Sequence, residues 1–349
     1  MPAPPTFQYE LIRERFQTLD CLVRPVWNAE IEGLLRQFLV YGRRDAELML
    51  GRGVMYFPII EHYLSQYNLP QGMKYLPLVE SSMRPKAVSH VGATGLWQFM
   101  PATARQFGLR VNHYLDERRD PYKSTEAALR YLAYLYEKYE SWELALAAYN
   151  AGSGTVDRAI RRAGSTDFWK IRSYLPRETR QYVPKLIVAT YIGEYHQEHG
   201  LQPRYPDFEL QFTRTVKVYH YITFLEIAKA TGASPTTLYK LNPGYKKGVI
   251  PSNPKGNYLI LPEAVVESFR AYLRKRNIEY HQGESLPEDL YRKSTYVVLV
   301  GDTLEALARM FDCSEEDIMR WNGLKSRELY YRQELIIYHP RKTPLKERA

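Results

Sequence analysis

Glu80 is the residue whose type and surroundings best suit acid–base chemistry. It ends the run Leu76-Pro-Leu-Val-Glu80, and removal from water raises the pKa of a carboxyl group, which lets it hold a proton and act as a general acid. Gly92 and Gly95 follow, and glycines let a loop bring its backbone close to a ligand. Gln98 can donate and accept hydrogen bonds. A lone glutamate is nevertheless most often a solvated helix residue, so spacing alone does not establish a catalytic role.

Length and composition exclude several classes of protein. The chain has 349 residues, 45% of them hydrophobic and 25% charged, which is typical of a globular protein of two or three domains. There is no run of about 18 apolar residues of the kind that spans a membrane. Cys21 and Cys313 cannot form a disulfide framework or a cysteine-rich zinc site, and we expect them to be buried small side chains.

Charge leaves the partner open. Lys and Arg number 48 against 39 Asp and Glu, a formal net charge of +9, which favours an anionic partner such as nucleic acid, a membrane surface or a wall polymer, but also fits a solvated surface. The 30 tyrosines could stack on sugars or bases, although we expect most in the core. A nucleic-acid binder is disfavoured because no basic run or aromatic RNA-binding motif occurs. The start, Met-Pro-Ala-Pro-Pro-Thr, lacks the features of a signal peptide, which fits either a cytosolic protein or an exported one whose signal is missing.

Apolar residues at helical spacing predict that the first 200 residues are all-α. Asn28 is expected to cap a helix with apolar positions at 31, 34, 35, 38 and 39. Similar stripes predict helices over 56–64, 75–80, 124–136, 143–150 and 182–195. Ser124 is expected to cap the helix at 124–136, and Gly152 to end the helix at 143–150. The helix that carries Glu80 must stop before Pro85, because the residue before a proline disfavours the helical conformation.

The pattern changes after Gly200, where 201–207 reads as a proline-punctuated linker. A strand at 295–300, a helix capped by Asp302 with Glu305, a helix capped by Ser314 with Asp317 and a strand at 334–338 form a βααβ unit of about 45 residues. Residues 215–261 have the same order, which indicates an internal repeat. The expected organisation is an all-α domain with an N-terminal helical extension at 1–205, βααβ units at 212–263 and 294–340, a connecting helix and linker at 264–293, and a charged tail at 341–349.

Four motifs in order resemble the catalytic core of the bacterial lytic transglycosylases of goose-lysozyme fold, in particular the membrane-bound type D branch that carries LysM modules. The family's Glu-Ser motif stands here as Glu80-Ser81, and its Gly-Leu-Met-Gln motif as Gly95-Leu96-Trp97-Gln98. Ala-Tyr-Asn-Ala-Gly is intact at 148–152, and a tyrosine after a Glu-Thr pair fits Glu178-Thr179-Arg-Gln-Tyr182. Trp97 replaces the family's methionine, a departure that we expect to alter the shape of a subsite. The resemblance covers residues 28–195.

The resemblance implies that Glu80 is the sole acid and base of a peptidoglycan lytic transglycosylase. It would protonate the β-1,4 oxygen between N-acetylmuramic acid and N-acetylglucosamine, and then take the proton of the muramyl 6-hydroxyl to close a 1,6-anhydro ring. No cofactor or metal is implied. The residues expected to contact or line the substrate are Ser81, Ser89, Gln98, Met100, Tyr149 and Asn150, with Tyr182 orienting the acid. Met100 and Tyr149 also fit core positions.

Two rival interpretations remain. A hydrolytic muramidase would need a second carboxylate, for which Asp116, Glu117, Asp120 and Glu126 are the nearby candidates in sequence; Asp120-Pro121 reads better as a turn into a helix. A catalytically silent wall-anchoring protein would use the cleft and modules only to hold glycan.

The βααβ units resemble LysM modules, which bind glycans that contain N-acetylglucosamine. The second unit carries the matching Gly301-Asp302-Thr303-Leu304 and Trp321-Asn322-Gly323-Leu324, whereas the first has Tyr221-Ile222-Thr223-Phe224 in place of the Gly-Asp-Thr turn. The first unit is therefore either a degenerate LysM module or a spacer. By implication the partner is peptidoglycan and the location is the bacterial envelope, in the periplasm, where a lipid anchor could hold the protein at the outer membrane. The sequence does not define an oligomeric state.

Overall fold

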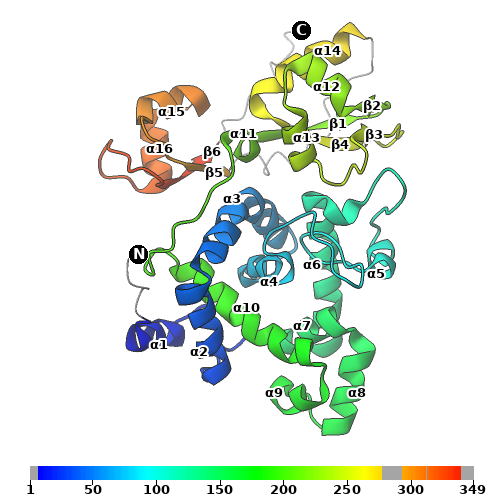
Figure 1. Ribbon diagram of the computed structural model, residues 1–349, viewed down its shortest axis with the longest axis vertical. Helices are drawn as coiled ribbons and strands as arrows, with labels where there is room; N and C mark the ends of the chain where they lie inside the picture. Colours follow the sequence, from blue (N-terminus) through cyan, green and yellow to red (C-terminus); the bar gives the residue numbers. More distant parts are fainter. Residues whose placement is uncertain (1–6, 277–292, 312, 339–349) are drawn as a thin grey trace, which may run out of the picture. The chain divides into compact units, whose positions relative to one another are not determined.

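The computed structural model describes residues 7–276, 293–311 and 313–338 (Figure 1). It divides into two compact units, Met1–Tyr205 and Pro206–Ala349, which are treated separately below. Of the expected connecting helix and linker at 264–293, residues 277–292 lie outside the described residues, and so does the expected charged tail at 341–349.

The first unit is helical, as the periodicity predicts. In its described residues β pairing is limited to isolated bridges between Val88 and Thr94, Thr94 and Phe99, and Val111 and Asp116. Its α-helices are α1 (Tyr9–Gln17), α2 (Ala29–Arg36), α3 (Arg43–Gln66), α4 (Leu76–Ser81), α5 (Pro101–Gln106), α6 (Pro121–Tyr139), α7 (Trp142–Ala151), α8 (Ser153–Ala163), α9 (Phe168–Ile171) and α10 (Arg177–Tyr195).

Helix α10 forms the centre of this unit. It packs against α2, α4 and α7, and Figure 1 shows it running between α2 and α7. Val183, Leu186, Ile187 and Val188 on it are fully buried. A helix that is apolar on most sides is typical of a core position, and it gives Tyr182, on its first turns, a rigid support.

The helix starts confirm one predicted cap and correct another. The Asn28 side chain accepts a hydrogen bond from the Ile31 N–H, as expected. Ser124 does not cap α6: the cap is Asp120, whose side chain accepts from the N–H groups of Tyr122 and Lys123. Proline is favoured at the first helical position because it has no N–H to satisfy there. Pro121 therefore starts the helix earlier than the apolar stripe predicts.

The second unit contains two small α/β modules. In the first, β1 (Thr213–Val218) pairs antiparallel with β4 (Asn257–Pro262), with Thr215 opposite Ile260. A second pair, β2 (Ile222–Thr223) with β3 (Val249–Ile250), was not predicted from the sequence. In the second, β5 (Lys293–Val297) pairs antiparallel with β6 (Glu334–Tyr338). The helices of this unit are α11 (Phe208–Gln211), α12 (Phe224–Thr231), α13 (Pro235–Leu241), α14 (Val266–Lys275), α15 (Leu304–Phe311) and α16 (Glu315–Asn322).

One asparagine in each module makes the same set of hydrogen bonds. Asn242 donates to the carbonyl of Ile260 at 2.7 Å and accepts from its N–H at 2.7 Å. Asn322 does the same with Ile336, at 2.8 and 2.6 Å. Each side chain thus ties the end of the second helix to the last strand of its module, which supports the predicted internal repeat.

Two details of the modules differ from expectation. Asp302 does not cap α15; its carboxylate accepts from the Leu299 N–H at 2.7 Å and closes the turn, while the Thr303 hydroxyl accepts from the Ala306 N–H at 3.1 Å. Ser314 and Asp317 do form the predicted reciprocal cap of α16. Helix α14, expected as a connector, packs against α12 of the first module.

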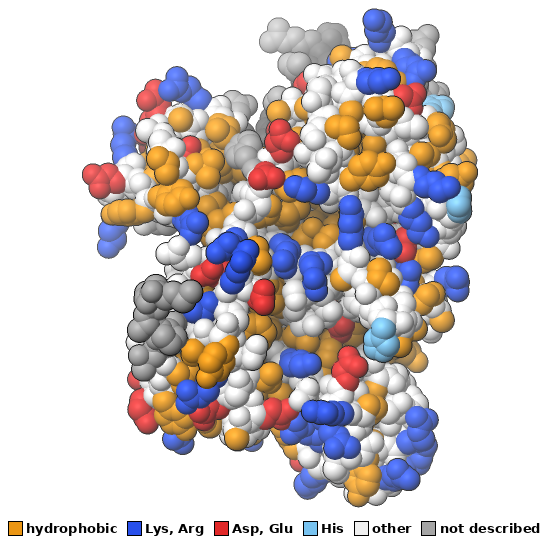
Figure 2. All heavy atoms as spheres, viewed as in Figure 1, with side chains coloured by type: hydrophobic (Ala, Val, Ile, Leu, Met, Phe, Trp, Pro, Cys, Tyr) orange, Lys and Arg blue, Asp and Glu red, His pale blue; other side chains and the backbone are white. Residues whose placement is uncertain are grey.

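The surface is rich in basic groups. Figure 2 shows Lys and Arg side chains spread widely over the face drawn, in keeping with the net charge of +9. In the part of the chain that the structure describes, no helix combines the length and apolar character needed to cross a membrane.

Candidate active site

Glu80 lies near the C-terminal end of α4, a short helix fixed by its apolar residues. Leu76 and Leu78 are buried, and α4 packs against α10. The helix ends because Ser82 adopts the left-handed conformation with φ 51°, and Met83 follows at φ 58°. Non-glycine residues in this conformation are uncommon and concentrate at functional sites.

The Glu80 carboxyl group is held by a hydrogen bond from a tyrosine. The hydroxyl of Tyr182, on α10, donates to Glu80 Oε1. Burial raises the pKa of Glu80 to about 7, against the lowering effect of the Tyr182 hydrogen bond; the charge of Glu178 raises this pKa further and that of Lys185 lowers it. Near neutral pH both protonation states of Glu80 are therefore populated, so this carboxyl group can deliver a proton and then accept one.

Tyr149 adjoins Glu80, and Asn150 follows it on α7. Tyr149 is close enough for the charge of Glu80 to contribute, after burial, to a raised tyrosine pKa. Its hydroxyl donates to the Trp97 carbonyl at 2.7 Å and not to Glu80. Asn150 accepts a hydrogen bond from the buried Thr179 hydroxyl at 2.8 Å, which leaves its amide NH₂ group as the end that could meet a ligand.

Buried Arg118 shapes the loop that precedes α5. Its guanidinium forms two hydrogen bonds to the Asp116 carboxylate, at 2.9 and 2.8 Å, and donates to the carbonyls of Gly92 at 3.0 Å and Phe99 at 3.2 Å. Gly95 passes so close that a Cβ there would lie 1.7 Å from the Arg118 carbonyl oxygen. The buried ion pair therefore holds the backbone on both sides of Gln98.

Gln98 presents an acceptor from this loop. Its backbone has φ 47°, and its amide nitrogen donates to the Gly95 carbonyl at 2.8 Å. The side-chain oxygen is then directed away from that carbonyl and suits an N–H group of a ligand. Ser89 accepts from the Ala93 N–H at 3.0 Å and shapes the loop tip. Met100 is 42% exposed, so it is open to a ligand rather than part of the core.

Two positions depart from expectation. Ser81 is buried, and its hydroxyl donates to the carbonyls of Leu96 at 2.9 Å and Pro77 at 3.2 Å. This geometry ties α4 to the loop and corrects the expected substrate contact. Trp97 is fully buried, with its indole N–H donating to Thr125 on α6 at 2.9 Å, so it packs in the core instead of altering the shape of a subsite directly.

The four carboxylates considered as a second catalytic acid all have structural partners. Asp116 pairs with Arg118 at 2.8 Å and Glu117 with Arg110 at 2.7 Å. Asp120 caps α6, and Glu126 accepts from the Tyr67 hydroxyl at 3.2 Å. None of the four contributes to the pKa of Glu80, whereas Glu178 does.

Sequence reasoning missed Arg118 and Thr179 as residues that position the site. Thr179 belongs to the Glu-Thr pair of the fourth motif, which singled out its location but not its bond to Asn150. Among the described residues, no three His, Cys, Asp or Glu side chains gather as a metal site would require.

Three segments of the chain match known protein families. Residues 57–172 match the transglycosylase SLT domain, 212–277 the LysM-like domain of lytic transglycosylase MltD, and 296–337 the LysM domain. The chain therefore contains a domain of the transglycosylase SLT type followed by domains of the LysM type, which confirms the predicted fold class.

Over 293 residues the chain is 32% identical to membrane-bound lytic murein transglycosylase D of Escherichia coli (strain K12), a match that covers 82% of this chain and 64% of the relative. The chain thus spans less than two thirds of that relative's length, and it is similar to that relative in sequence. It is also 31% identical over 202 residues to the soluble lytic murein transglycosylase of the same organism, covering 55% of this chain and 31% of the relative. A crystal structure of the 70 kDa soluble lytic transglycosylase of Escherichia coli matches with a TM-score of 0.33 and 28% identity, over 40% of this chain and 24% of the other.

Proposed function

We propose that the protein is a peptidoglycan lytic transglycosylase that cleaves the β-1,4 bond between N-acetylmuramic acid and N-acetylglucosamine and leaves 1,6-anhydromuramic ends. The observation that carries this proposal is a single carboxyl group, Glu80, with a pKa of about 7, oriented by the Tyr182 hydroxyl. The names of the relatives, which are lytic murein transglycosylases, support the same reaction.

In the proposed mechanism, protonated Glu80 donates its proton to the glycosidic oxygen as the bond from the muramyl C1 breaks. The acetamido group of the same sugar stabilises the positive charge that develops at C1. The Glu80 carboxylate then removes the proton of the 6-hydroxyl, whose oxygen bonds to C1. Glu80 ends protonated, no water is consumed, and the substrate supplies the groups that a second carboxylate and a water provide in other glycosidases.

Gln98 and Asn150 are proposed to orient the substrate. The side-chain oxygen of Gln98 would accept from the acetamido N–H, and the NH₂ group of Asn150 would donate to a carbonyl or hydroxyl. Both amides are fixed in advance, Gln98 by the Gly95 carbonyl and Asn150 by Thr179. Such preorganisation lowers the cost of placing the sugar beside Glu80.

The LysM modules are proposed to hold glycan strands beside the catalytic domain. A protein with this activity acts in the bacterial envelope, and we propose a periplasmic location. The relative's name, membrane-bound, makes attachment through a lipid anchor a reasonable extension. The first module is proposed either to bind glycan weakly or to act as a spacer.

The test compares wild type with Glu80→Gln and two matched variants, Glu126→Gln and Glu178→Gln, for release of soluble fragments from purified peptidoglycan. Glu80→Gln removes the acid while keeping the shape, and is expected to lower release at least 100-fold, the usual scale of general acid–base catalysis. Glu126→Gln is expected to retain activity. If Glu178→Gln lowers activity as much as Glu80→Gln does, the result would favour a hydrolase that uses two carboxylates. Full activity of Glu80→Gln would overturn the proposal, and absence of release by wild type would favour the anchoring protein.

A further inference from the structure

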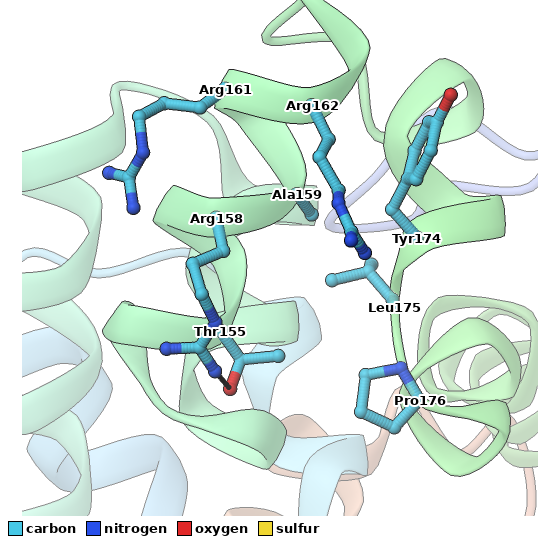
Figure 3. A pocket seen from close by; sticks show the side chains of 8 residues that line it. All are labelled: Thr155, Arg158, Ala159, Arg161, Arg162, Tyr174, Leu175 and Pro176. Atoms are coloured by element: carbon cyan, nitrogen blue, oxygen red, sulfur yellow. Dashed lines mark hydrogen bonds between the residues drawn. The ribbon is translucent and has the colours of Figure 1, made fainter.

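A cavity of about 750 Å³ lies in the helical unit, between α8 and the segment that joins α9 to α10. Its lining residues come from two short stretches of chain: Thr155, Arg158, Ala159, Arg161, Arg162, Tyr174, Leu175 and Pro176. None of them is among the side chains that contact Glu80, Gln98 or Asn150. Figure 3 shows the cavity from close by.

One face of α8 supplies the charge. Thr155, Arg158, Ala159 and Arg162 follow the i, i+3, i+4, i+7 spacing that places side chains on the same side of a helix. In Figure 3 the Arg162 guanidinium extends toward Leu175, and Arg158 lies beside Thr155, to whose hydroxyl it donates at 3.2 Å. Arg161 lines the cavity as well, but its side chain extends away from Arg162 and Leu175 in the same view. Arg158 and Arg162 are therefore the two cations on the face of α8 that also carries Thr155 and Ala159.

These two guanidinium groups are not neutralised within the part of the chain that the structure describes. Neither forms an ion pair with a described carboxylate. The acid of this helix, Asp157, is taken by Lys138 at 2.8 Å and by the Tyr139 hydroxyl at 2.8 Å. Figure 2 shows blue side chains gathered over α8. A cavity with two uncompensated planar cations suits a ligand that carries carboxylates, which guanidinium binds with two parallel hydrogen bonds.

The opposite wall is apolar and held in place. Within it Leu175 is 2% exposed, whereas Tyr174 is 48% exposed and Pro176 is exposed as well. The guanidinium of Arg180 donates to the carbonyls of Ser173 and Leu175, both at 2.7 Å, and so fixes the backbone of this wall. The apolar surface that this wall offers to a ligand is therefore that of Tyr174 and Pro176. A simple inorganic anion would use the guanidinium groups and leave this surface uncovered.

We propose that this cavity binds a short acidic peptide, with carboxylates on Arg158 and Arg162 and small apolar side chains against Tyr174 and Pro176. In the proposed function, the glycan substrate bears short peptide stems that contain alanine and free carboxylates. The cavity then recognises the stem of a strand that is cut at Glu80. The source of the peptide rests on the proposed function, but the peptide binding itself does not.

The first test measures binding of a free tetrapeptide stem to the full chain by calorimetry, with the same peptide amidated at its carboxylates and with inorganic phosphate as comparisons. The double variant Arg158→Gln/Arg162→Gln is expected to weaken tetrapeptide binding at least tenfold. A matched control is Arg13→Gln/Arg24→Gln, which removes two exposed arginines elsewhere in the same unit and is expected to leave the affinity unchanged. Equal weakening by the control, unchanged binding by the double variant, equal binding of the amidated peptide, or arginine-dependent binding of phosphate alone would each overturn the proposal.

The second test separates this site from the catalytic one. Lytic turnover is compared on peptidoglycan that bears stems and on glycan strands whose stems have been removed by an amidase. The double variant is expected to lower turnover on the first substrate several-fold and to leave turnover on the second unchanged; equal loss on both would contradict a peptide site. If no variant and no substrate gives lysis, the proposed function fails while the tetrapeptide affinities still decide the peptide proposal.

Discussion

Replacing Tyr182 with phenylalanine removes one hydroxyl group. Among the described residues, this hydroxyl is the only side-chain group that donates a hydrogen bond to Glu80. Burial raises the pKa of Glu80 to about 7, and the Tyr182 hydrogen bond lowers it against that trend. A donor to a carboxylate stabilises the ionised form. Its removal therefore raises the pKa of Glu80 further, so the variant holds its proton to higher pH.

The size of the shift follows from the strength of such a bond. A hydrogen bond to a charged group contributes about 1.5–3 kcal/mol, and one pKa unit corresponds to about 1.4 kcal/mol. The Tyr182→Phe variant is thus expected to have a Glu80 pKa about 1–2 units higher than wild type. Because the first step needs protonated Glu80, the alkaline limb of kcat/KM should move up by the same amount. The maximum rate should fall about 10–100-fold, because the acid loses its orientation.

The assay is kcat/KM against pH on soluble glycan strands, alongside a ¹³C NMR titration of the Glu80 carboxyl group that does not depend on activity. The control is Tyr149→Phe, which deletes the same atom from a neighbouring ring whose hydroxyl donates to the Trp97 carbonyl instead. The control should leave the alkaline limb in place. An unchanged or lowered Glu80 pKa in Tyr182→Phe would refute the assigned electrostatics.

Three other sets of variants test the site and the modules. Glu80→Gln should raise the free energy of unfolding at pH 9 by up to about 3 kcal/mol, measured by urea unfolding, and should give no gain below pH 4.5. The pKa of the Glu80 carboxyl group rises from 4.5 to about 7 on folding, so burying its ionised form costs free energy at high pH, whereas burying its protonated form does not. Gly95→Ala should destabilise the helical unit by more than about 2 kcal/mol in thermal unfolding and abolish lysis. The control Gly92→Ala has a similar φ but no atom within 4 Å of the added Cβ, so it should destabilise the unit less. Equal destabilisation by the two variants would contradict the close approach of Gly95 to Arg118. Asn322→Ala should weaken glycan pull-down by disrupting its module, and Asn242→Ala should do so only if the first module binds glycan as well.

Periodicity predicted the helices well where the apolar stripe coincides with the start of the helix. Asn28 caps α2 as expected because the first apolar position follows three residues later. The stripe of α6 begins after Ser124, but Asp120 and Pro121 can already satisfy the helix start, so the helix begins earlier. The prediction that Asp302 caps α15 was wrong for a related reason. A tight turn before the helix needs the same carboxylate, which accepts a hydrogen bond from the Leu299 N–H instead of capping the helix.

The catalytic motifs named the residues around Glu80, but not the contacts that position them. Arg118 reaches carbonyls 19 and 26 positions earlier in the sequence, and such non-local contacts have no periodic signal. Trp97 sits within a motif, yet its indole pairs with Thr125 on another helix. A motif indicates that a residue matters, whereas only the packing shows whether its side chain faces the ligand or the core.

The most direct test of the proposed reaction is mass spectrometry of the fragments released from peptidoglycan in water enriched with oxygen-18. Transfer of the muramyl group to its own 6-hydroxyl predicts fragments lighter than hydrolysis products by one water, without a reducible muramyl end and without incorporated oxygen-18. Fragments with reducing muramyl ends that carry oxygen-18 would mean that water attacks C1, and would contradict Glu80 acting as the sole acid and base of a lytic transglycosylase.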